Sequence, residues 1–463
     1  MTDRTALVTG ASGYIGGHLV PALLDAGWRV RVLARTPSRL DAPWRDRVTV
    51  VQGDAGEAAD LREALDGVQV AYYLLHSMDG RGNFRERDRG LAKTFARAAR
   101  GAGIGRIVYL SGLHPEGELS DHLASRVEVG EILLGSGVPT AVLQAGVVLG
   151  AGSASFDMLR HLTERLPVAV GPRWLRNRIQ PIAITDVVHY LVRAAELALD
   201  VNRTIDVGAA DVLTYLEMMR GYARVAGLGP RLFGTVPVLT PWLASHWVGV
   251  VTPVPAAIAK PLVGSLIHDA VKHEDDARTL LGDPPGGLKG FDEAVRLATA
   301  SIEAKRWRRT LARVGAGVAA TAVAGSLLTD PTSAWYRGLR KPAWQPPAIA
   351  FPVVWTTLYA LITVAATATS ADLEERGRGA EAADFRRAFA ANLVLNAGWS
   401  GLFFRAHHLP AATVGAAALA GSSIDLARRG ALAGPGKGAA LGAYAAWCAF
   451  ATVLSGAVAR RNR

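Results

Sequence analysis

The chain has 463 residues, a formal net charge of +11 and a mean hydropathy of +0.19, which is too apolar for an ordinary soluble protein with 20% charged residues. We therefore expect two to four domains, of which one part is soluble and another membranous. The single cysteine, Cys448, excludes an intramolecular disulfide, and the cations flank apolar segments instead of forming one basic face, which argues against nucleic acid as a partner and for anionic lipid headgroups.

The first predicted elements are a strand, a glycine-rich turn and a helix. The apolar residues 6–8 run into the segment TGASGYIGGHL, and helical periodicity continues to residue 27. In such a turn the first glycine allows the tight bend, the second lets the backbone approach a pyrophosphate, and the third lets the helix pack closely on the strand. This context disfavours a plain strand-to-helix turn. The predicted dinucleotide-binding residues are Gly10, Ser12, Gly13, Tyr14, Ile15 and Gly16.

The second strand, residues 29–34, ends at Arg35, where proteins that bind NAD usually carry an acid for the ribose hydroxyls. A guanidinium suits a 2′-phosphate, so we expect NADP(H), with NAD(H) and a simple surface role for Arg35 left as alternatives. Further strands are predicted at 48–51, 70–75, 106–110 and 140–143, with helices between them, which indicates a doubly wound parallel sheet. Asp54, His76 and Ser77 follow strands at the carboxyl edge, where these folds bind ligands.

Residues 4–300 or so resemble the short-chain dehydrogenase/reductase superfamily, in particular its NmrA-like branch. The resemblance rests on the glycine-rich segment, Gly53-Asp54, YYLLHSM at 72–78, IVYLSG at 107–112 and QPIAITDV at 180–187. It implies that Asp54 contacts the adenine and that Ser111 occupies the catalytic serine position.

The sequence departs from this family at the proton donor. Members that transfer hydride use a Tyr and a Lys four residues later, whereas His122 and Arg126 stand at that spacing here. Imidazole titrates near neutrality, so His122 is a candidate acid, with a packing role as the alternative. We therefore expect Ser111, His122 and Arg126 to form the catalytic set if the domain turns over, and cofactor binding alone if it does not.

An apolar run at 232–266 is broken by Pro237, Pro241, Pro253 and Pro255, which argues against a membrane-spanning helix. Three interpretations remain open: a lid over a substrate pocket, a segment on the membrane surface with Trp242 and Trp247 at headgroup level, or an ordinary apolar core.

Five apolar stretches follow, at 311–328, 351–369, 389–404, 409–426 and 438–459, each near the length of a bilayer-spanning helix. We predict a soluble domain at 1–305 and a five-helix membrane bundle at 306–463. Cations are more numerous at the helix ends on the side of the soluble domain, so the positive-inside rule places that domain in the cytoplasm, as for a bacterial inner-membrane protein. The lack of an apolar signal region before the first strand agrees with this expectation.

The bundle segment resembles the tryptophan-rich sensory protein and translocator protein (TspO/MBR) family. The match includes WY at 335–336, KP at 341–342, Trp344, PP at 346–347, Trp355, Tyr359, Asn392, Asn396, WS at 399–400, FF at 403–404, Tyr444 and Trp447. It implies a five-helix bundle, often dimeric, that binds porphyrins, sterols or other flat hydrophobic molecules under its first loop. Two positions depart from the family, because Ala443 replaces the usual Pro and Ser455 the usual Asn.

The ligand site expected from this resemblance combines aromatic faces for stacking with cations for acidic groups. Its predicted residues are Trp335, Tyr336, Lys341, Trp344, Trp355, Tyr359, Asn392, Asn396, Trp399, Phe403 and Trp447. Each part of this site has an alternative role. The aromatic residues could form a belt at the membrane interface without binding a ligand, and Asn392 and Asn396 could only hold helices together. We expect no metal site.

Three functions remain open at this stage. The leading one is a membrane-anchored NADP(H)-binding protein whose bundle binds a tetrapyrrole or a related lipophilic ligand, which the first domain reduces or whose redox state it senses. The second is an NADPH-dependent reductase of an isoprenoid, quinone or carotenoid-like lipid, with the bundle as anchor. The third is a sensor or transporter without chemistry, in which NADPH controls ligand binding.

Overall fold

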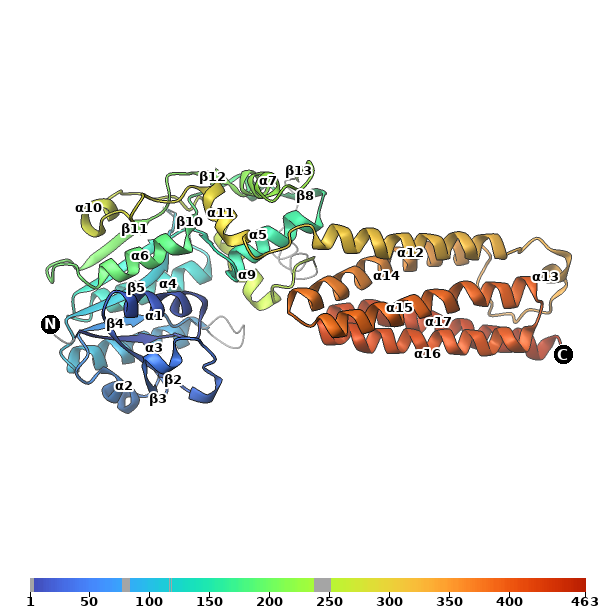
Figure 1. The fold of residues 1–463 in the computed structure, drawn as a ribbon, viewed down its shortest axis with the longest axis horizontal. Coiled ribbons are helices and arrows are strands. Elements are labelled where there is room, and N and C mark those ends of the chain that lie inside the picture. The colour runs from blue at the N-terminus through green and yellow to red at the C-terminus, as the bar shows by residue number, and fades with distance from the viewer. Residues whose placement is uncertain (1–3, 77–83, 116, 118, 237–250) are drawn as a thin grey trace. The chain divides into compact units, whose positions relative to one another are not determined.

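The computed structural model describes residues 4–76, 84–115, 117, 119–236 and 251–463. It consists of two compact units, Met1–Glu303 and Ala304–Arg463. Each unit has its own hydrophobic core, so we describe them one at a time (Figure 1).

The first unit is built on a seven-stranded parallel sheet with the strand order β11-β6-β5-β4-β1-β2-β3. Alternate residues of the interior strand β1 point to opposite faces, and both faces are buried. Ala6 and Val8 lie in the core beneath α1 and α6, whereas Leu7 lies in the core beneath α2, α3 and α4. This confirms the predicted doubly wound arrangement of strands and helices. The seven strands are β1 Thr5–Thr9, β2 Arg29–Ala34, β3 Thr49–Gln52, β4 Val70–Tyr73, β5 Arg106–Gly112, β6 Thr140–Ala145 and β11 Arg203–Val207.

The covering helices are α1 Tyr14–Asp25, α2 Ala58–Leu65, α3 Phe84–Gly101, α4 Asp121–Leu134, α6 Ile184–Ala194 and α10 Ala277–Leu281. Short helical turns lie at Pro37–Arg39, Arg45–Arg47 and Arg173–Arg176.

A third core lies beyond the carboxyl end of the sheet and contains residues of three strand pairs and four helices. These elements are β7 Val148–Leu149, β8 Val168–Pro172, β9 Arg178–Ile179, β10 Ile182–Ala183, β12 Leu213–Thr214, β13 Leu232–Val236, α5 Ala154–Arg165, α7 Tyr215–Val225, α9 Ala256–Ser265 and α11 Phe291–Thr299. The proline-broken run therefore contains a strand and a short helix within an apolar core, while Pro237, Pro241, Trp242 and Trp247 lie outside the described residues.

The second unit is helical throughout, and its long helices lie side by side (Figure 1). They are α12 Arg306–Leu328, α14 Ala350–Glu375, α15 Gly379–Ser400, α16 Leu409–Ala433 and α17 Pro435–Arg461, with the short α13 Ala334–Gly338 in the first connection. A π-helical turn, Gly401–Arg405, continues α15. Four of these helices, α12, α14, α16 and α17, are long and apolar enough to cross a membrane.

Helix α15 falls short of that standard because its first half carries charged side chains, among them Asp384, Arg386 and Arg387. The predicted apolar stretch, 389–404, corresponds to the second half of α15 and the π-helical turn. The helical bundle is thus confirmed, whereas the fifth crossing stays a prediction.

Candidate functional site

The glycine-rich turn between β1 and α1 has the shape that a dinucleotide pyrophosphate requires. Gly10 has a φ of +73°, and a Cβ placed there would lie 2.5 Å from the Leu74 carbonyl oxygen. A Cβ on Gly16 would lie 2.4 Å from the Gly10 carbonyl oxygen, so only glycine lets the helix approach the turn this closely. The helix N-terminus at Tyr14 leaves its first backbone N–H groups for an anion. These residues therefore fit a dinucleotide.

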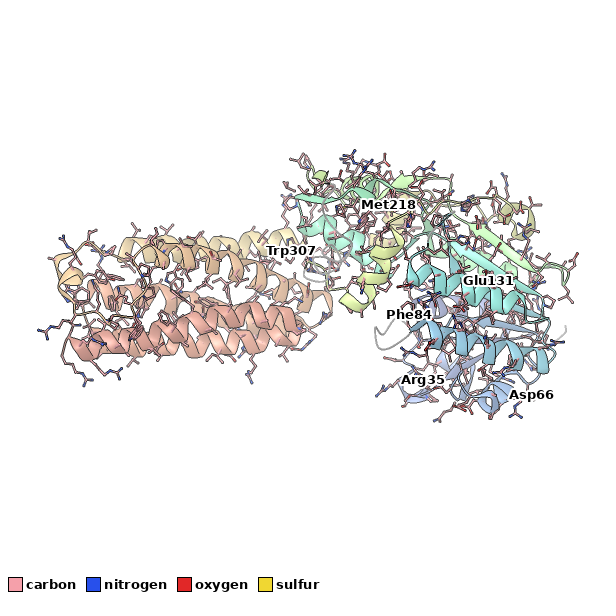
Figure 2. All side chains as sticks on the ribbon, turned by 180° about the vertical axis from the view of Figure 1, so that it is seen from behind. Arg35, Asp66, Phe84, Glu131, Met218 and Trp307 are labelled. Carbon is pink, nitrogen blue, oxygen red and sulfur yellow. The ribbon has the colours of Figure 1, made fainter. Side chains whose placement is uncertain are left out.

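A cleft of about 890 Å³ extends from this turn along the ends of β1, β2 and β4. Five of the predicted cofactor-binding residues, Gly10, Ser12, Arg35, Asp54 and His76, line it. Arg35 lies exposed at the end of β2 (Figure 2).

Two further arginines, Arg39 and Arg87, also line the cleft. The carboxylate of Asp54 accepts a hydrogen bond from the Gly56 N–H at 2.8 Å. Among the described residues Asp54 is the one acidic side chain in the lining. The cleft is therefore well supplied with cations for phosphate groups.

The predicted Tyr14 is not among the described residues that line the cleft. The Tyr14 side chain turns toward the loop after β7, where its hydroxyl would lie 2.1 Å from a Cβ on Gly150. Its contribution to the cofactor site therefore comes from its backbone at the helix start. Ser77 lies outside the described residues.

Three side chains at one wall of the cleft form a hydrogen-bonded chain. His76 Nδ1 lies 2.9 Å from Asp88 Oδ2, and His76 Nε2 lies 3.1 Å from His122 Nδ1. Ser125 Oγ donates to the same Asp88 oxygen at 3.3 Å. Asp88 is 2% exposed and His122 8% exposed, so the chain is shielded from solvent. We call it the Asp88–His76–His122 relay.

The carboxylate sets the direction of these hydrogen bonds. An ionised carboxylate only accepts, so His76 Nδ1 carries a proton and His76 Nε2 is the acceptor. His122 Nδ1 then donates to His76, which leaves the lone pair on His122 Nε2. His122 Nε2 can therefore accept a proton.

Both imidazoles are neutral at physiological pH. Burial lowers the pKa of His122 to about 3, with further lowering from the Arg126 and His76 charges. Burial also lowers the pKa of His76, although the hydrogen bond to Asp88 opposes this shift. The relay is therefore uncharged apart from the carboxylate.

The other two predicted catalytic residues flank this relay. Ser111, at the end of β5, is 3% exposed, and among the described residues its hydroxyl makes no hydrogen bond of good geometry. Arg126 donates from its guanidinium to the Leu110 carbonyl oxygen at 2.6 Å. The guanidinium is thus bonded to β5, and its charge disfavours protonation of His122.

In the second unit the predicted ligand residues fall into two groups. Trp335, Tyr336, Trp399 and Phe403 pack on one another together with Phe404, and the Trp335 ring stacks on His407 with centroids 4.1 Å apart. Lys341 Nζ lies 3.9 Å from the centroid of the Tyr336 ring. We call these residues the Trp399 cluster.

The second group contains Trp344, Trp355, Tyr359 and Trp447. Trp344 and Trp447 both contact Phe450, and Trp355 contacts Tyr444. Trp344 is 48% exposed, so one of its faces is accessible.

The two asparagines take part in a buried network between helices. Tyr359 donates to Asn396 at 2.8 Å, and Asn396 donates to the Tyr444 hydroxyl at 3.1 Å. Tyr444 donates to Asn392 at 2.9 Å, and Asn392 donates to the Ser423 hydroxyl at 3.0 Å. Both amides have protein partners, which favours the alternative that they join helices.

Comparison with known proteins decides the family of each unit. A family model described as NAD(P)H-binding matches residues 10–133, and the TspO/MBR family model matches residues 314–461. Ceramide reductase of Caulobacter vibrioides is 34% identical over 243 residues, which are 50% of this chain and 74% of that protein. The translocator protein of Sus scrofa is 33% identical over 129 residues, which are 28% of this chain and 75% of that protein. The chain joins an NAD(P)H-binding reductase-like domain, called the reductase domain below, to a TspO/MBR domain.

Solved structures agree on the fold of the reductase domain. An NADPH-dependent quinone oxidoreductase of Escherichia coli in complex with NADPH superimposes with a TM-score of 0.51 at 20% identity, over 63% of this chain and 98% of that chain. The reductase domain thus takes NAD(P)(H) as its cofactor, and the TspO/MBR domain makes the protein an integral membrane protein.

Sequence reasoning missed Asp88, Ser125, Arg39 and Arg87. Asp88 lies in a strongly charged stretch of α3, so its sequence looks like an exposed helix face. The sequence signal for the burial of Asp88 is that Ala92, Phe95 and Ala99 follow it at helical spacing, which places Asp88 on the apolar face of an amphipathic helix.

Proposed function

We propose that the reductase domain interconverts a hydroxyl and a carbonyl group on a lipophilic substrate, with NADP(H) as cofactor and His122 as the proton-exchanging residue. The observation that carries the proposal is the Asp88–His76–His122 relay at the wall of the nucleotide cleft. It supplies the proton acceptor that the missing Tyr and Lys pair supplies in related enzymes.

The cofactor, when bound in the cleft, donates or accepts the hydride. The backbone around Gly10 and Gly16 would hold its pyrophosphate. We propose NADP(H) over NAD(H), because Arg35 and Arg39 line the cleft beyond β2, and an acid for the ribose hydroxyls is not found among its described lining residues there.

The protein groups handle the proton. In the oxidising direction His122 Nε2 accepts the hydroxyl proton of the substrate while Asp88 stabilises the positive charge that spreads over the two imidazoles. In the reducing direction His122 first takes up a proton from solvent at Nε2, and the imidazolium then gives this proton to the carbonyl oxygen as the hydride arrives. Ser111, buried near the end of β5 with an unpaired hydroxyl, is suited to donate a hydrogen bond to that oxygen.

The lipid character of the substrate is supported by the fusion itself and by the relative named ceramide reductase. A test is incubation of the full protein in lipid nanodiscs with deuterated NADPH and candidate ceramide-type, sterol and quinone carbonyl compounds, followed by mass spectrometry of the lipids. We expect transfer of one deuterium to a lipid and its loss in His122→Gln, with NADPH binding retained. NADPH binding without transfer to any of these lipids would instead support the sensor without chemistry.

For the TspO/MBR domain we propose five membrane crossings with the reductase domain in the cytoplasm of a bacterial cell. Helix α15 packs with α12, α14 and α16 along the bundle, which supports its crossing despite the charges in its first half. Lys437 and Asp372 pair at 2.7 Å, and Arg386 pairs with Glu374, so these charges meet partners from other helices at one end of the bundle. Labelling of single cysteines in the loops from either side of the membrane tests the topology.

We also propose that this domain binds a flat lipophilic molecule, such as a porphyrin, a sterol or an isoprenoid compound, beside Trp344 and Trp447. The accessible Trp344 ring and the unpaired indole N–H of Trp447 favour this position. Quenching of tryptophan fluorescence by protoporphyrin, and its loss in Trp344→Leu, tests the site. Association of the bundle as a homodimer is a further proposal, tested by the mass of the protein in nanodiscs.

A further inference from the structure

A second cleft of about 320 Å³ lies in the third core of the reductase domain. It is enclosed by α5, α7, α9 and the strand pair of β8 and β13. Its walls are apolar, with Met158, Leu162, Met219, Phe233 and Val263 among the lining side chains. Its volume is at the low end of the roughly 300–1,000 Å³ typical of small-molecule sites, so it suits one hydrocarbon chain better than a macrocycle.

Two lining residues carry buried polar atoms without hydrogen bonds. In the part of the chain that the structure describes, the Tyr215 hydroxyl and the Trp174 indole nitrogen have no partner. Tyr215 is 2% exposed and burial raises the pKa of its phenol, so the hydroxyl stays protonated. Both groups can donate a hydrogen bond, and buried donors are rarely left unpaired. A ligand that satisfies these two donors is an otherwise apolar molecule with an oxygen atom that accepts hydrogen bonds.

Helix α9 connects the cleft with the start of α4. A Cβ on Gly264 of α9 would be 3.8 Å from the Cβ of Ser120, which caps the N-terminus of α4. His122 is in the first turn of α4, and Val263, next to Gly264, lines the cleft. Helix α9 thus contacts both the cleft and the N-terminus of the helix that carries His122.

We propose that this cleft binds the aliphatic chain of an acyl lipid and that an amide or ester carbonyl of that lipid accepts hydrogen bonds from Tyr215 and Trp174. This inference rests on the proposed function, because the lipid bound in the cleft is taken to be the substrate on which the relay acts. It assigns substrate selection to α5 and α7.

The test is photolabelling of the full protein in lipid nanodiscs with the N-methylamide of dodecanoic acid bearing a terminal diazirine, compared with the same hydrocarbon chain without the amide. We expect the amide probe to label peptides of α5 and α7. Tyr215→Phe should lower labelling by the amide probe about three- to tenfold, the worth of one buried hydrogen bond, and leave labelling by the hydrocarbon unchanged. Met219→Trp should block both probes by filling the cleft.

The matched control is Tyr190→Phe, which removes a buried hydroxyl that donates to Asp283 elsewhere in the domain. It should leave both probes unaffected, and retained NADPH binding shows that each variant is folded. The proposal is overturned if label is not enriched on α5 and α7, or if Tyr215→Phe behaves as Tyr190→Phe does. Labelling requires no turnover, so a failure to detect hydride transfer would leave this result standing, and a failure of labelling would leave the proposed chemistry standing.

Discussion

Asp88 offers the sharpest test of the relay, because Asp88→Asn changes the charge and the hydrogen-bonding direction while keeping the size. The new amide can turn its NH₂ group toward His76 Nδ1, which moves the His76 proton to Nε2. His76 then donates to His122 Nδ1, and the His122 proton moves to Nε2. The nitrogen that faces the substrate becomes a donor, and the proton acceptor is lost.

The size of the effect follows from this tautomer change. A positioned general base contributes about 10²–10⁴ in rate, so kcat should fall by roughly that factor, which is about 3–5 kcal/mol in the barrier. The lost charge-assisted hydrogen bond costs about 1.5–3 kcal/mol of stability. Part of this cost is offset because the variant no longer buries a charge at a position that is only 2% exposed. Domains are stable by about 5–15 kcal/mol, so the variant should stay folded.

The assay is NADP⁺-dependent oxidation of the hydroxyl lipid, the direction in which His122 Nε2 accepts a proton, together with NADPH affinity and thermal unfolding. The matched control is Asp206→Asn, because Asp206 is also buried but accepts its hydrogen bond from the His273 backbone. We expect kcat to fall in Asp88→Asn alone, with unchanged NADPH affinity. If Asp88→Asn loses no more activity than Asp206→Asn while His122→Gln is inactive, the assignment of the tautomers is wrong.

Three further outcomes are expected. Arg35→Glu should weaken NADPH binding about 10- to 100-fold and leave NADH binding unchanged in a fluorescence titration. The reason is that one charge-assisted contact to the 2′-phosphate is lost and a repulsion is added. Equal effects on both cofactors would count against the proposed preference for NADPH. The folded domain keeps His122 neutral down to about pH 3, whereas the unfolded chain protonates this histidine below about pH 6.5. The free energy of unfolding should therefore fall as the pH drops from about 6.5 to about 3, by up to about 1.4 kcal/mol per pH unit. His122→Gln should flatten this pH profile, measured by denaturant unfolding. Asn392→Ala should destabilise the bundle by about 1–3 kcal/mol in detergent unfolding, since Tyr444 and Ser423 lose a partner, whereas Val394→Ala on the exposed side of α15 should change little.

The parts of this protein that the sequence predicted are those encoded by neighbouring residues. The turn from Gly10 to Gly16 is recognisable within one short segment, because its backbone leaves no room for a Cβ at Gly10 and Gly16. The alternation of strands and helices, and the aromatic pattern of the TspO/MBR domain, are equally local. These features gave the cofactor class and the two-part architecture.

The parts that escaped prediction depend on contacts between distant segments. Asp88 lies twelve positions from its partner His76, and His122 lies forty-six positions from His76. The helical spacing of Asp88 with Ala92, Phe95 and Ala99 indicates its burial, but no local pattern identifies its partners. The unpaired hydroxyl of Tyr215 likewise becomes informative only once its surroundings are known. Helix α15 shows the same limit, because its charges mask its place in the bundle, and the partner of Arg386, Glu374, lies on another helix.

The π-helical turn at Gly401–Arg405 has a consequence for how length changes in this chain would act. Its widened backbone, with the Ala406 N–H bonded to the Gly401 carbonyl oxygen at 2.9 Å, accommodates one residue more than a regular helical turn does. Deleting a single residue there would close the widened turn to an ordinary helical one. The Phe404–Trp399 and Trp335–His407 ring contacts involve residues in or just after this turn, so the aromatic packing at this end of the bundle depends on an insertion that ordinary helix geometry does not need.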